Sequence, residues 1–258
     1  MSVAATLSFG DGLGVRTIII ASCLEITGKS AVIRQIRVIR VSNYSSIILP
    51  QEFNKNQNNM PIDCTGILTA DIHFDCINAP VGGIEQNVVL INKDDIDLSA
   101  TTLGTDNRLQ VTQIQLKPGK TGYQLTGVKQ SNGKAWELVK KENAPDKFKH
   151  TFSGVIFNPS LANKTQADNL SKGGKYVVVI EQVWKGGANA DAFEVLGYHS
   201  GLELTTMTNS SKENDNMIMF ELASADGFEE TTMPKTYFKE AEAYGIRKAL
   251  FDNNFIEA

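Results

Sequence analysis

The feature that most constrains this chain is an apolar period of two, which starts near Thr65 and recurs in short runs. Asp71–Cys76 alternates polar and apolar positions, Val88–Ile91 is wholly apolar, and Lys175–Trp184 is apolar enough for a central strand. Alternation is typical of strands with one buried face, and short apolar runs are typical of strands buried on both faces. The chain is therefore predicted to be mostly β.

Turn residues separate these runs, as in Asn78–Gly83 and in the solvated turn predicted at Asn92–Asp97. The Asn-Gly step in Ser131–Lys134 favours a tight hairpin turn between its neighbouring strands. Further strands are predicted at Val111–Leu116, Gly122–Lys129, Ala135–Lys140, His150–Phe157, Phe193–Leu204 and Met217–Leu222. About ten short strands separated by turns indicate a β-sandwich or barrel.

One helix interrupts this pattern. Asn158 or Ser160 can cap it, and Gly173–Gly174 can end it, which predicts a helix over about residues 160–171 that flanks the sheets. Its predicted inward positions are Leu161, Ala162, Ala167 and Leu170. A second, amphipathic helix is possible in Tyr237–Phe251.

Three segments are predicted: residues 1–59, a β-sandwich domain over 60–236, and a helical tail over 237–258. Residues 1–59 carry six basic and three acidic side chains, which leaves 19 basic and 26 acidic for the remainder. Arginines at every third position in Ala31–Val41 suit a helix, whereas the β-branched residues between them favour a strand. Two interpretations of residues 1–59 stay open: a basic arm that reaches a neighbouring subunit or nucleic acid, or upstream over-translation before a start at Met60.

Composition narrows the classes of protein to consider. The formal net charge is −4, which argues against overall attraction to nucleic acid or an anionic membrane. No apolar run approaches 18 residues, so no membrane span is predicted. The three cysteines, Cys23, Cys64 and Cys76, form no paired motif and suggest free thiols in a reducing compartment.

Two fragments imitate a phosphate-binding loop, Gly28-Lys29-Ser30 and Gly119-Lys120-Thr121. Each lacks the earlier glycine that such a loop needs, since Cys23 and Ile114 stand in those places. Asp71, His73 and Asp75 could put three metal-binding side chains on one strand face, but a solvated face has the same pattern.

The remaining search for chemistry identifies no catalytic residue. The pairs Asp94–Asp95 and Glu229–Glu230 fall in predicted turns, and no G-x-S-x-G elbow is present. Neither Cys64 nor Cys76 has basic neighbours that would activate its thiol. Trp136 and Trp184 are interpreted as core or interface anchors. We therefore expect no catalytic, cofactor or metal site, and a protein that is not an enzyme.

A family resemblance rests on residues His150 to about Pro234 and on Asp71–Asp97. Its features are a strand, a helix and a strong strand, followed by Gly197-Tyr198, Gly201-Leu202 and Glu221-Leu222, and then by Gly227 with Glu229-Glu230. Over residues 60–236 the chain resembles the tail-tube (major tail) proteins of long-tailed phages and prophages of Bacteroides-like bacteria.

This resemblance implies a structural virion protein of the phage tail, made in the cytoplasm of the bacterial host. Its partners would be copies of itself in stacked hexameric rings and other tail proteins, and DNA would pass through without specific binding. No cofactor or membrane is implied. The acidic body could line a channel that repels phosphates. Alternatives are a capsid decoration or head-fibre protein, and a carbohydrate-binding β-sandwich whose exposed aromatics would be Trp136, Trp184 and Tyr198.

One polar loop is the expected inter-subunit contact, becoming ordered only against the next ring. It consists of Asn209, Ser210, Ser211, Lys212, Glu213, Asn214, Asp215 and Asn216.

Overall fold

The structure is a computed structural model. It describes residues 68, 70–104, 107–240 and 242–256 in full, and residues 2–11, 14–27 and 30–38 by their backbone. The chain forms two compact units, Met1–Asn54 and Lys55–Ala258. The second unit is called the body below.

The first unit contains a three-stranded antiparallel sheet in the order β1-β2-β3. Its strands are β1 (Ser2–Asp11), β2 (Gly14–Thr27) and β3 (Ser30–Val38). Over residues 31–38 of the arginine-rich segment, the backbone of β3 settles the open choice between helix and strand in favour of a strand. The β-branched residues between the arginines favour this conformation.

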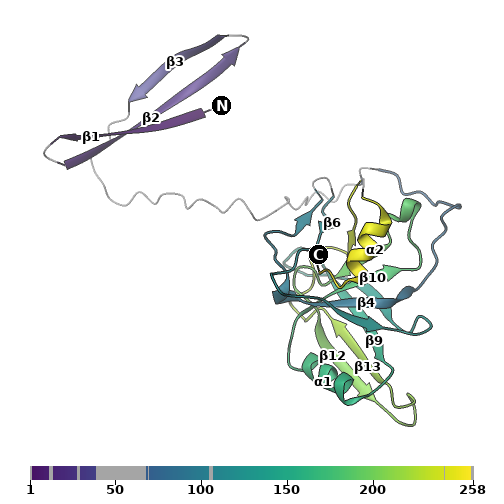
Figure 1. Cartoon of the computed structure of the whole chain (residues 1–258). Coiled ribbons are helices and arrows are strands. Elements are labelled where there is room, and N and C mark those ends of the chain that lie inside the picture. The colour runs from purple at the N-terminus through teal and green to yellow at the C-terminus, as the bar shows by residue number, and fades with distance from the viewer. Residues whose placement is uncertain are drawn as a thin grey trace. The chain divides into compact units, whose positions relative to one another are not determined.

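The body is mostly β, with helices at its margins (Figure 1). Its strands are β4 (Ile84–Asn92), β5 (Thr102–Leu103), β6 (Gln110–Gln113), β7 (Tyr123–Thr126), β8 (Gly133–Val139), β9 (Lys147–Ile156), β10 (Tyr176–Gln182), β11 (Phe193–Leu196), β12 (Glu203–Asn209), β13 (Ile218–Ala223) and β14 (Lys235–Tyr237). Its helices are α1 (Leu161–Leu170) and α2 (Tyr244–Asp252), with short 3₁₀ turns at Lys93–Asp95 and Gly187–Asn189. None of the helices in the described residues has the length and apolar character that a membrane crossing needs.

Two sheets form the body. One has seven strands in the order β5-β6-β14-β11-β10-β4-β7, and the other has four in the order β12-β13-β9-β8. Within the described residues neither sheet closes into a barrel. The predicted β-sandwich with flanking helices is confirmed, and the barrel alternative is not realised.

The seven-stranded sheet is buried on both faces around β10. On one face, Val178 and Ile180 pack with Phe152 and Leu222 of the four-stranded sheet. On the other face, Val177 and Val179 pack in a cluster that includes Phe193, Phe251 and Phe255. Double burial explains why the sequence of β10 is a continuous apolar run, and the prediction of a central strand there is confirmed.

Helix α1 begins where the sequence predicts. The Ser160 side chain accepts a hydrogen bond from the Asn163 N–H at 3.3 Å and so caps the first turn. Ala167 is buried and Leu170 packs against the inter-sheet core, as predicted. The inward placement of Leu161 and Ala162 is wrong, because the first turn projects into solvent and leaves Leu161 84% exposed.

Helix α2 lies within the predicted C-terminal segment and belongs to the core of the body. Phe251 is fully buried against Phe193, with ring centroids 5.2 Å apart, and Phe255 stacks edge-on against Tyr237. The Arg247 guanidinium is also buried and donates to the backbone carbonyls of Tyr237 and Asn189 at 3.3 and 3.2 Å. These contacts make the C-terminal segment part of the sandwich.

One predicted strand and one predicted hairpin are wrong. Phe193–Leu204 is two strands, β11 and β12, which lie in different sheets. The chain crosses between them at Gly197, whose φ of +71° and close approach to the Tyr176 carbonyl disfavour any side chain. The predicted hairpin at Ser131–Lys134 is also absent, because β7 pairs with β4 whereas β8 pairs with β9.

Asn132 replaces that hairpin with a bridge between the sheets. Its side chain is buried, donates to the Gln86 carbonyl at 3.4 Å and accepts from the Val155 N–H at 3.2 Å. Gln86 lies in the seven-stranded sheet and Val155 in the four-stranded one. The Asn-Gly step thus marks a crossover and not a tight turn.

We expect Asn132→Ala to lower the free energy of unfolding by about 2 kcal/mol, because it leaves the buried Val155 N–H without its acceptor and removes the bond to the Gln86 carbonyl. Urea denaturation followed by tryptophan fluorescence measures this loss. Asn143→Ala, at an exposed loop position, is the matched control and should change stability little. Equal stabilities for the two variants would contradict the bridging role.

Two more local predictions fail. Residues 71–76 form no strand, and their side chains are exposed. No strand of the described chain pairs with them, so the alternating pattern lacks the ladder that it requires. Asn92–Asp97 contains a 3₁₀ turn, in which Asp95 is buried and accepts from the Asn92 amide at 2.8 Å.

Candidate functional site

The two outer strands of the four-stranded sheet are its most open surface. β8 and β12 end the sheet on opposite sides. In β8 the consecutive residues Ala135, Trp136, Glu137 and Leu138 are all exposed, so both faces of the strand are open. Trp136 and Leu138 are 45% and 48% exposed. An edge strand of this kind is a template for pairing with another chain.

The opposite edge, β12, has the same character with smaller side chains. Thr205, Thr206, Thr208 and Asn209 are exposed along it. Its inner neighbour β13 is in antiparallel register with it from Glu203 to Asn209. One copy of the sheet thus offers an apolar edge at β8 and a hydroxyl-rich edge at β12.

The predicted contact loop, residues 209–216, joins β12 to β13 and has internal hydrogen bonds. The Asn209 amide donates to the carbonyls of Asn216 and Met217 at 2.8 and 3.0 Å. The Ser210 carbonyl accepts from the N–H groups of Asn214 and Asn216, both at 3.1 Å. The loop therefore has a conformation of its own within one chain, and its contact with a neighbouring subunit stays a prediction.

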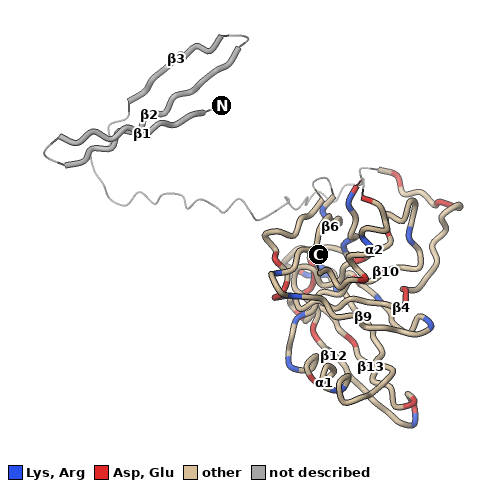
Figure 2. Tube along the Cα trace, viewed as in Figure 1, with Lys and Arg blue, Asp and Glu red and all other residues tan. Residues whose placement is uncertain are grey.

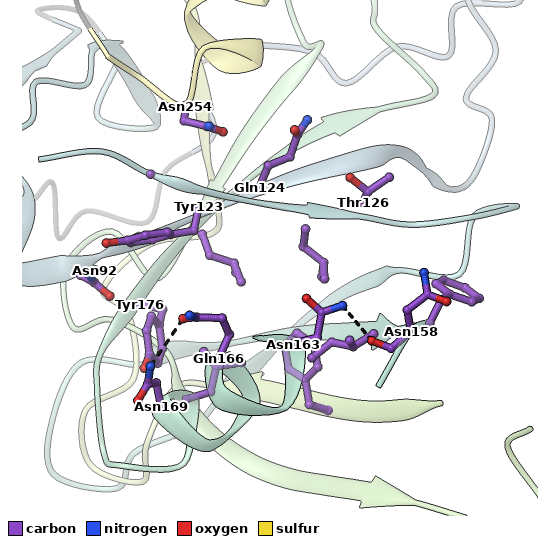
Figure 3. Close-up of a pocket in the computed structure, with 17 residues that line it drawn as sticks. Asn92, Tyr123, Gln124, Thr126, Asn158, Asn163, Gln166, Asn169, Tyr176 and Asn254 are labelled. Carbon is purple, nitrogen blue, oxygen red and sulfur yellow. Dashed lines mark hydrogen bonds between the residues drawn. The ribbon is translucent and has the colours of Figure 1, made fainter. Parts of the chain in front are cut away.

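A cleft of about 860 Å³ lies between β7 and α1 (Figure 3). Tyr123 points into it from β7, and Asn163 and Gln166 point into it from α1. Leu125, Ile156, Leu170 and Phe220 supply apolar lining. Further polar residues complete the lining, and none of the residues that form it carries a charge: Asn92, Gln124, Thr126, Asn158, Asn169, Tyr176 and Asn254.

Side-chain amides both donate and accept hydrogen bonds, so this lining suits a neutral polar ligand or a peptide backbone. The sequence analysis missed this cleft. Its one local signal was the spacing of Asn163, Gln166 and Asn169, which puts three amides on one face of α1. The rest of the lining comes from strands far apart in the sequence, which no local pattern brings together.

Buried charged side chains gather around Gly197–Leu202 and Glu229-Glu230, two of the segments on which the family resemblance rests. The Glu230 carboxylate accepts from the N–H groups of His199 and Ser200 at 2.9 and 2.7 Å. Burial raises its pKa and outweighs the opposing hydrogen bonds and the charges of Lys93 and Lys235. Burial also lowers the pKa of Lys235 to about 8. All of these groups hold loops of the same body together, so the cluster has a structural role.

Glu229, the neighbour of Glu230, is also bound to lysine. Its carboxylate lies 2.5 Å from the Lys141 Nζ and 3.9 Å from the Lys147 Nζ. The hydrogen bond from Lys141 lowers its pKa to about 2. The expectation of a solvated loop pair is therefore wrong for Glu229-Glu230, because the loop folds back against β8 and β9.

The other polar motifs show no sign of a site. The Asp71 Oδ2 and the His73 Nε2 are 3.8 Å apart, and both side chains are almost fully exposed. The Asp75 carboxylate accepts hydrogen bonds from the N–H groups of Ile77 and Asn78 and so caps a turn. Among the described residues no group of three or more His, Cys, Asp or Glu side chains could hold a metal ion. Lys120 of the second phosphate-loop imitation pairs with Asp95 at 3.0 Å.

Two sequence candidates, Gly28-Lys29-Ser30 and Cys64, lie outside the described side chains. The three aromatic residues of the carbohydrate-binding alternative occupy different settings. Tyr198 is buried in the core, Trp136 lies on the edge strand β8, and Trp184 follows β10 and donates to the Asn78 carbonyl at 2.8 Å. They therefore do not form one exposed aromatic surface.

Comparison with known proteins gives no relative: a scan of protein families and searches of curated proteins and of solved structures all return no match.

Proposed function

We propose that this chain is the subunit of a phage tail tube, which assembles into stacked rings around a channel for DNA. The observation that carries the proposal is the pair of open edges, β8 and β12, on the four-stranded sheet. Two different edges on one subunit support head-to-tail association, and a head-to-tail contact whose rotation closes forms a ring. Pairing of β8 with β12 of the next copy would continue the four-stranded sheet around that ring and leave this sheet no free edge.

The outer face of the four-stranded sheet suits a DNA channel. Thr206, Thr208, Ser153 and Glu221 lie on this face by the strand register, opposite the buried Phe152 and Leu222. Lys147 and Lys149 lie on the same face, where Glu137 is opposite Lys149 and Glu229 is 3.9 Å from the Lys147 Nζ. Hydroxyl and acidic side chains offer no attraction to phosphates, and the acidic neighbours offset the charges of the two lysines. In the view of Figure 2, lysines, arginines and acidic residues are interspersed along the trace of the body. This arrangement supports passage of DNA without specific binding.

We expect Leu138→Lys to stop ring formation while leaving the subunit folded. Leu138 is about half exposed on β8, and a lysine on an edge strand opposes pairing with another chain. Sedimentation velocity should show rings for the unaltered chain and monomers for the variant. Leu98→Lys is the matched control, since Leu98 is 56% exposed in a turn away from both edges. Rings of Leu138→Lys at the abundance of the control would contradict pairing through β8.

The runner-up is a capsid decoration or head-fibre protein, which would share the β-sandwich and would need no catalytic residue. It predicts monomers or trimers in the same sedimentation experiment, so the size of the assembly separates the two proposals. A carbohydrate-binding role has one supporting observation, the amide-lined cleft. Calorimetric titration with neutral oligosaccharides tests it directly.

A further inference from the structure

The segment that precedes β4, residues 70–78, has the sequence of a strand but pairs with nothing in the described chain. It alternates Asp71, His73 and Asp75 with apolar residues. The apolar side chains are strongly exposed: Ile72 is 86% exposed, Phe74 is 74% exposed and Ile77 is 93% exposed. Figure 1 shows this stretch as a coil at the margin of the body, and Figure 2 shows acidic residues along it.

Single exposed apolar residues are ordinary on protein surfaces, but several within one short segment are characteristic of an interaction site. Ile72 and Phe74 also fall on one side of an extended chain, as in a half-buried strand, whereas Ile77 lies in the turn that the Asp75 carboxylate caps. The segment therefore has one face fit for burial and lacks a partner strand.

The cleft beside β7 offers the matching edge. β7 ends the seven-stranded sheet, and the Gly122 N–H just before it points away from β4 and donates to the Asn254 carbonyl at 2.9 Å. Backbone groups alternate in direction along a strand, so those of Gln124 and Thr126 point the same way as those of Gly122. Apart from the ladder with β4, no hydrogen bond within the described residues engages the backbone of either.

The interior of the cleft matches the two faces of the segment. Leu125, Ile156 and Leu170 are partly buried and line it beside the open edge, where two apolar side chains can pack. Gln124 and Thr126 alternate with Leu125 along β7 and lie on its other face, where their amide and hydroxyl groups can donate to carboxylates such as those of Asp71 and Asp75. No acidic residue lines the cleft, so nothing there repels the segment.

Geometry favours the cleft of another copy. The Asn78 carbonyl is held by the Trp184 indole N–H, near Gly83 at the start of β4. The cleft includes Leu90 and Asn92 at the other end of β4, a strand of nine residues at about 3.4 Å each. The coil and α1 are also well separated in Figure 1. A donor and an acceptor on opposite sides of one subunit make a head-to-tail contact.

We infer that residues 70–78 of one copy add as a strand to the β7 edge of the next copy, with Ile72 and Phe74 packed into the amide-lined cleft. This inference rests on the proposed function, in which it supplies a second contact between subunits besides the β8–β12 edge pairing. Strand addition of this kind draws affinity from main-chain hydrogen bonds and specificity from alternate side chains.

The test combines assembly with cross-linking. Two variants of the full chain remove the two sides of the contact: Ile72→Asp with Phe74→Asp on the segment, and Gln124→Pro on the edge, where proline removes the outward N–H. Both should lose the tubes seen for the unaltered chain, whereas a control with Leu98→Asp and Leu161→Asp should keep them. Gln124→Ala separates loss of the N–H from loss of the side chain, and should also keep them.

The cross-link measures proximity without relying on tubes. One copy keeps Cys76, an exposed thiol, and has serine at positions 23 and 64; the other has serine at all three natural cysteines and Gln124→Cys. A short bismaleimide should join the two copies with a yield at least about tenfold above that for a partner with Leu98→Cys in place of Gln124→Cys.

The outcomes separate the two claims. Tubes that persist in both variants, together with a cross-link no stronger than the control, overturn strand addition and leave the tail-tube proposal standing. A specific cross-link from a chain that never forms rings supports strand addition and overturns the tail-tube proposal. Loss of tubes in both variants, with a specific cross-link, supports both.

Discussion

Glu181→Ala should lower the free energy of unfolding by about 3 kcal/mol, because it breaks a buried charge cluster that ties α2 to β10. The Glu181 carboxylate is 4% exposed and accepts hydrogen bonds from the Lys185 Nζ at 2.6 Å and from the Tyr244 hydroxyl, while the Lys248 Nζ lies 3.5 Å away. Its loss leaves two lysines without a buried counter-charge. This loss is at the low end of the roughly 3–5 kcal/mol that follows removal of one partner of a buried ion pair. The reason is that both lysines keep about a quarter of their side chains in solvent.

The pH dependence of this difference is a second check. Burial acts to raise the pKa of Glu181, but the hydrogen bonds from Lys185 and Tyr244 and the charge of Lys248 outweigh it, so the pKa is lowered. A lowered pKa means stabilisation above the ordinary value of 4.5 that is lost as the pH falls below it. Urea denaturation at pH 7 and pH 3 should therefore show a smaller difference in acid. Glu142→Ala, at an exposed loop position, is the control, and an equal loss for both variants would contradict the assignment.

Acidification should destabilise the body by about 3 kcal/mol between pH 6.5 and pH 4 through His150 alone. The imidazole is 1% exposed, its Nδ1 accepts from the Gly197 N–H at 3.2 Å, and its Nε2 donates to the Thr232 carbonyl at 3.0 Å. Burial lowers the pKa of His150 to about 4, helped by the charge of Lys235 and opposed by the bond to Thr232. The unfolded chain takes up the proton near pH 6.5, so stability is full above that pH and falls below it.

Two measurements check this prediction. Urea denaturation at pH 7 and pH 4.5 should show the loss in the unaltered chain and a smaller loss in His150→Gln, which cannot take up the proton. Burial also lowers the pKa of His199 to about 4, so His150→Gln should keep part of the pH dependence. Imidazole NMR signals identify His150, with the exposed His73 as a reference signal. Protonation of folded His150 near pH 6.5 would contradict the account.

Local physical chemistry accounts for what could be predicted from the sequence. β10 could be predicted because a strand buried on both faces must be apolar at every position, and α1 because Ser160 supplies a cap with a nearby side-chain oxygen. The failures concern packing against, or pairing with, distant parts of the chain. The Asn-Gly step at Asn132 has the chemistry of a hairpin turn, yet β7 and β8 pair with strands from elsewhere in the chain. Such partners are chosen by long-range packing, which local patterns do not contain.

The candidate surfaces were even harder to predict from the sequence. An open edge such as β8 is defined by which strand is last in a sheet, and a cleft such as that beside β7 by which segments meet there. Residues 71–76 are a second case in which the local sequence does not identify the partner. Their alternating pattern has the polarity of a strand with one apolar face, but it does not say which chain supplies the neighbouring strand, and in this structure the described residues of the same chain do not.

Negative-stain electron microscopy of the purified full chain, over a series of protein concentrations, tests the central claim most directly. The account predicts rings with a central channel that stack into tubes as the concentration rises. Monomers or trimers that never form rings at any concentration would contradict it.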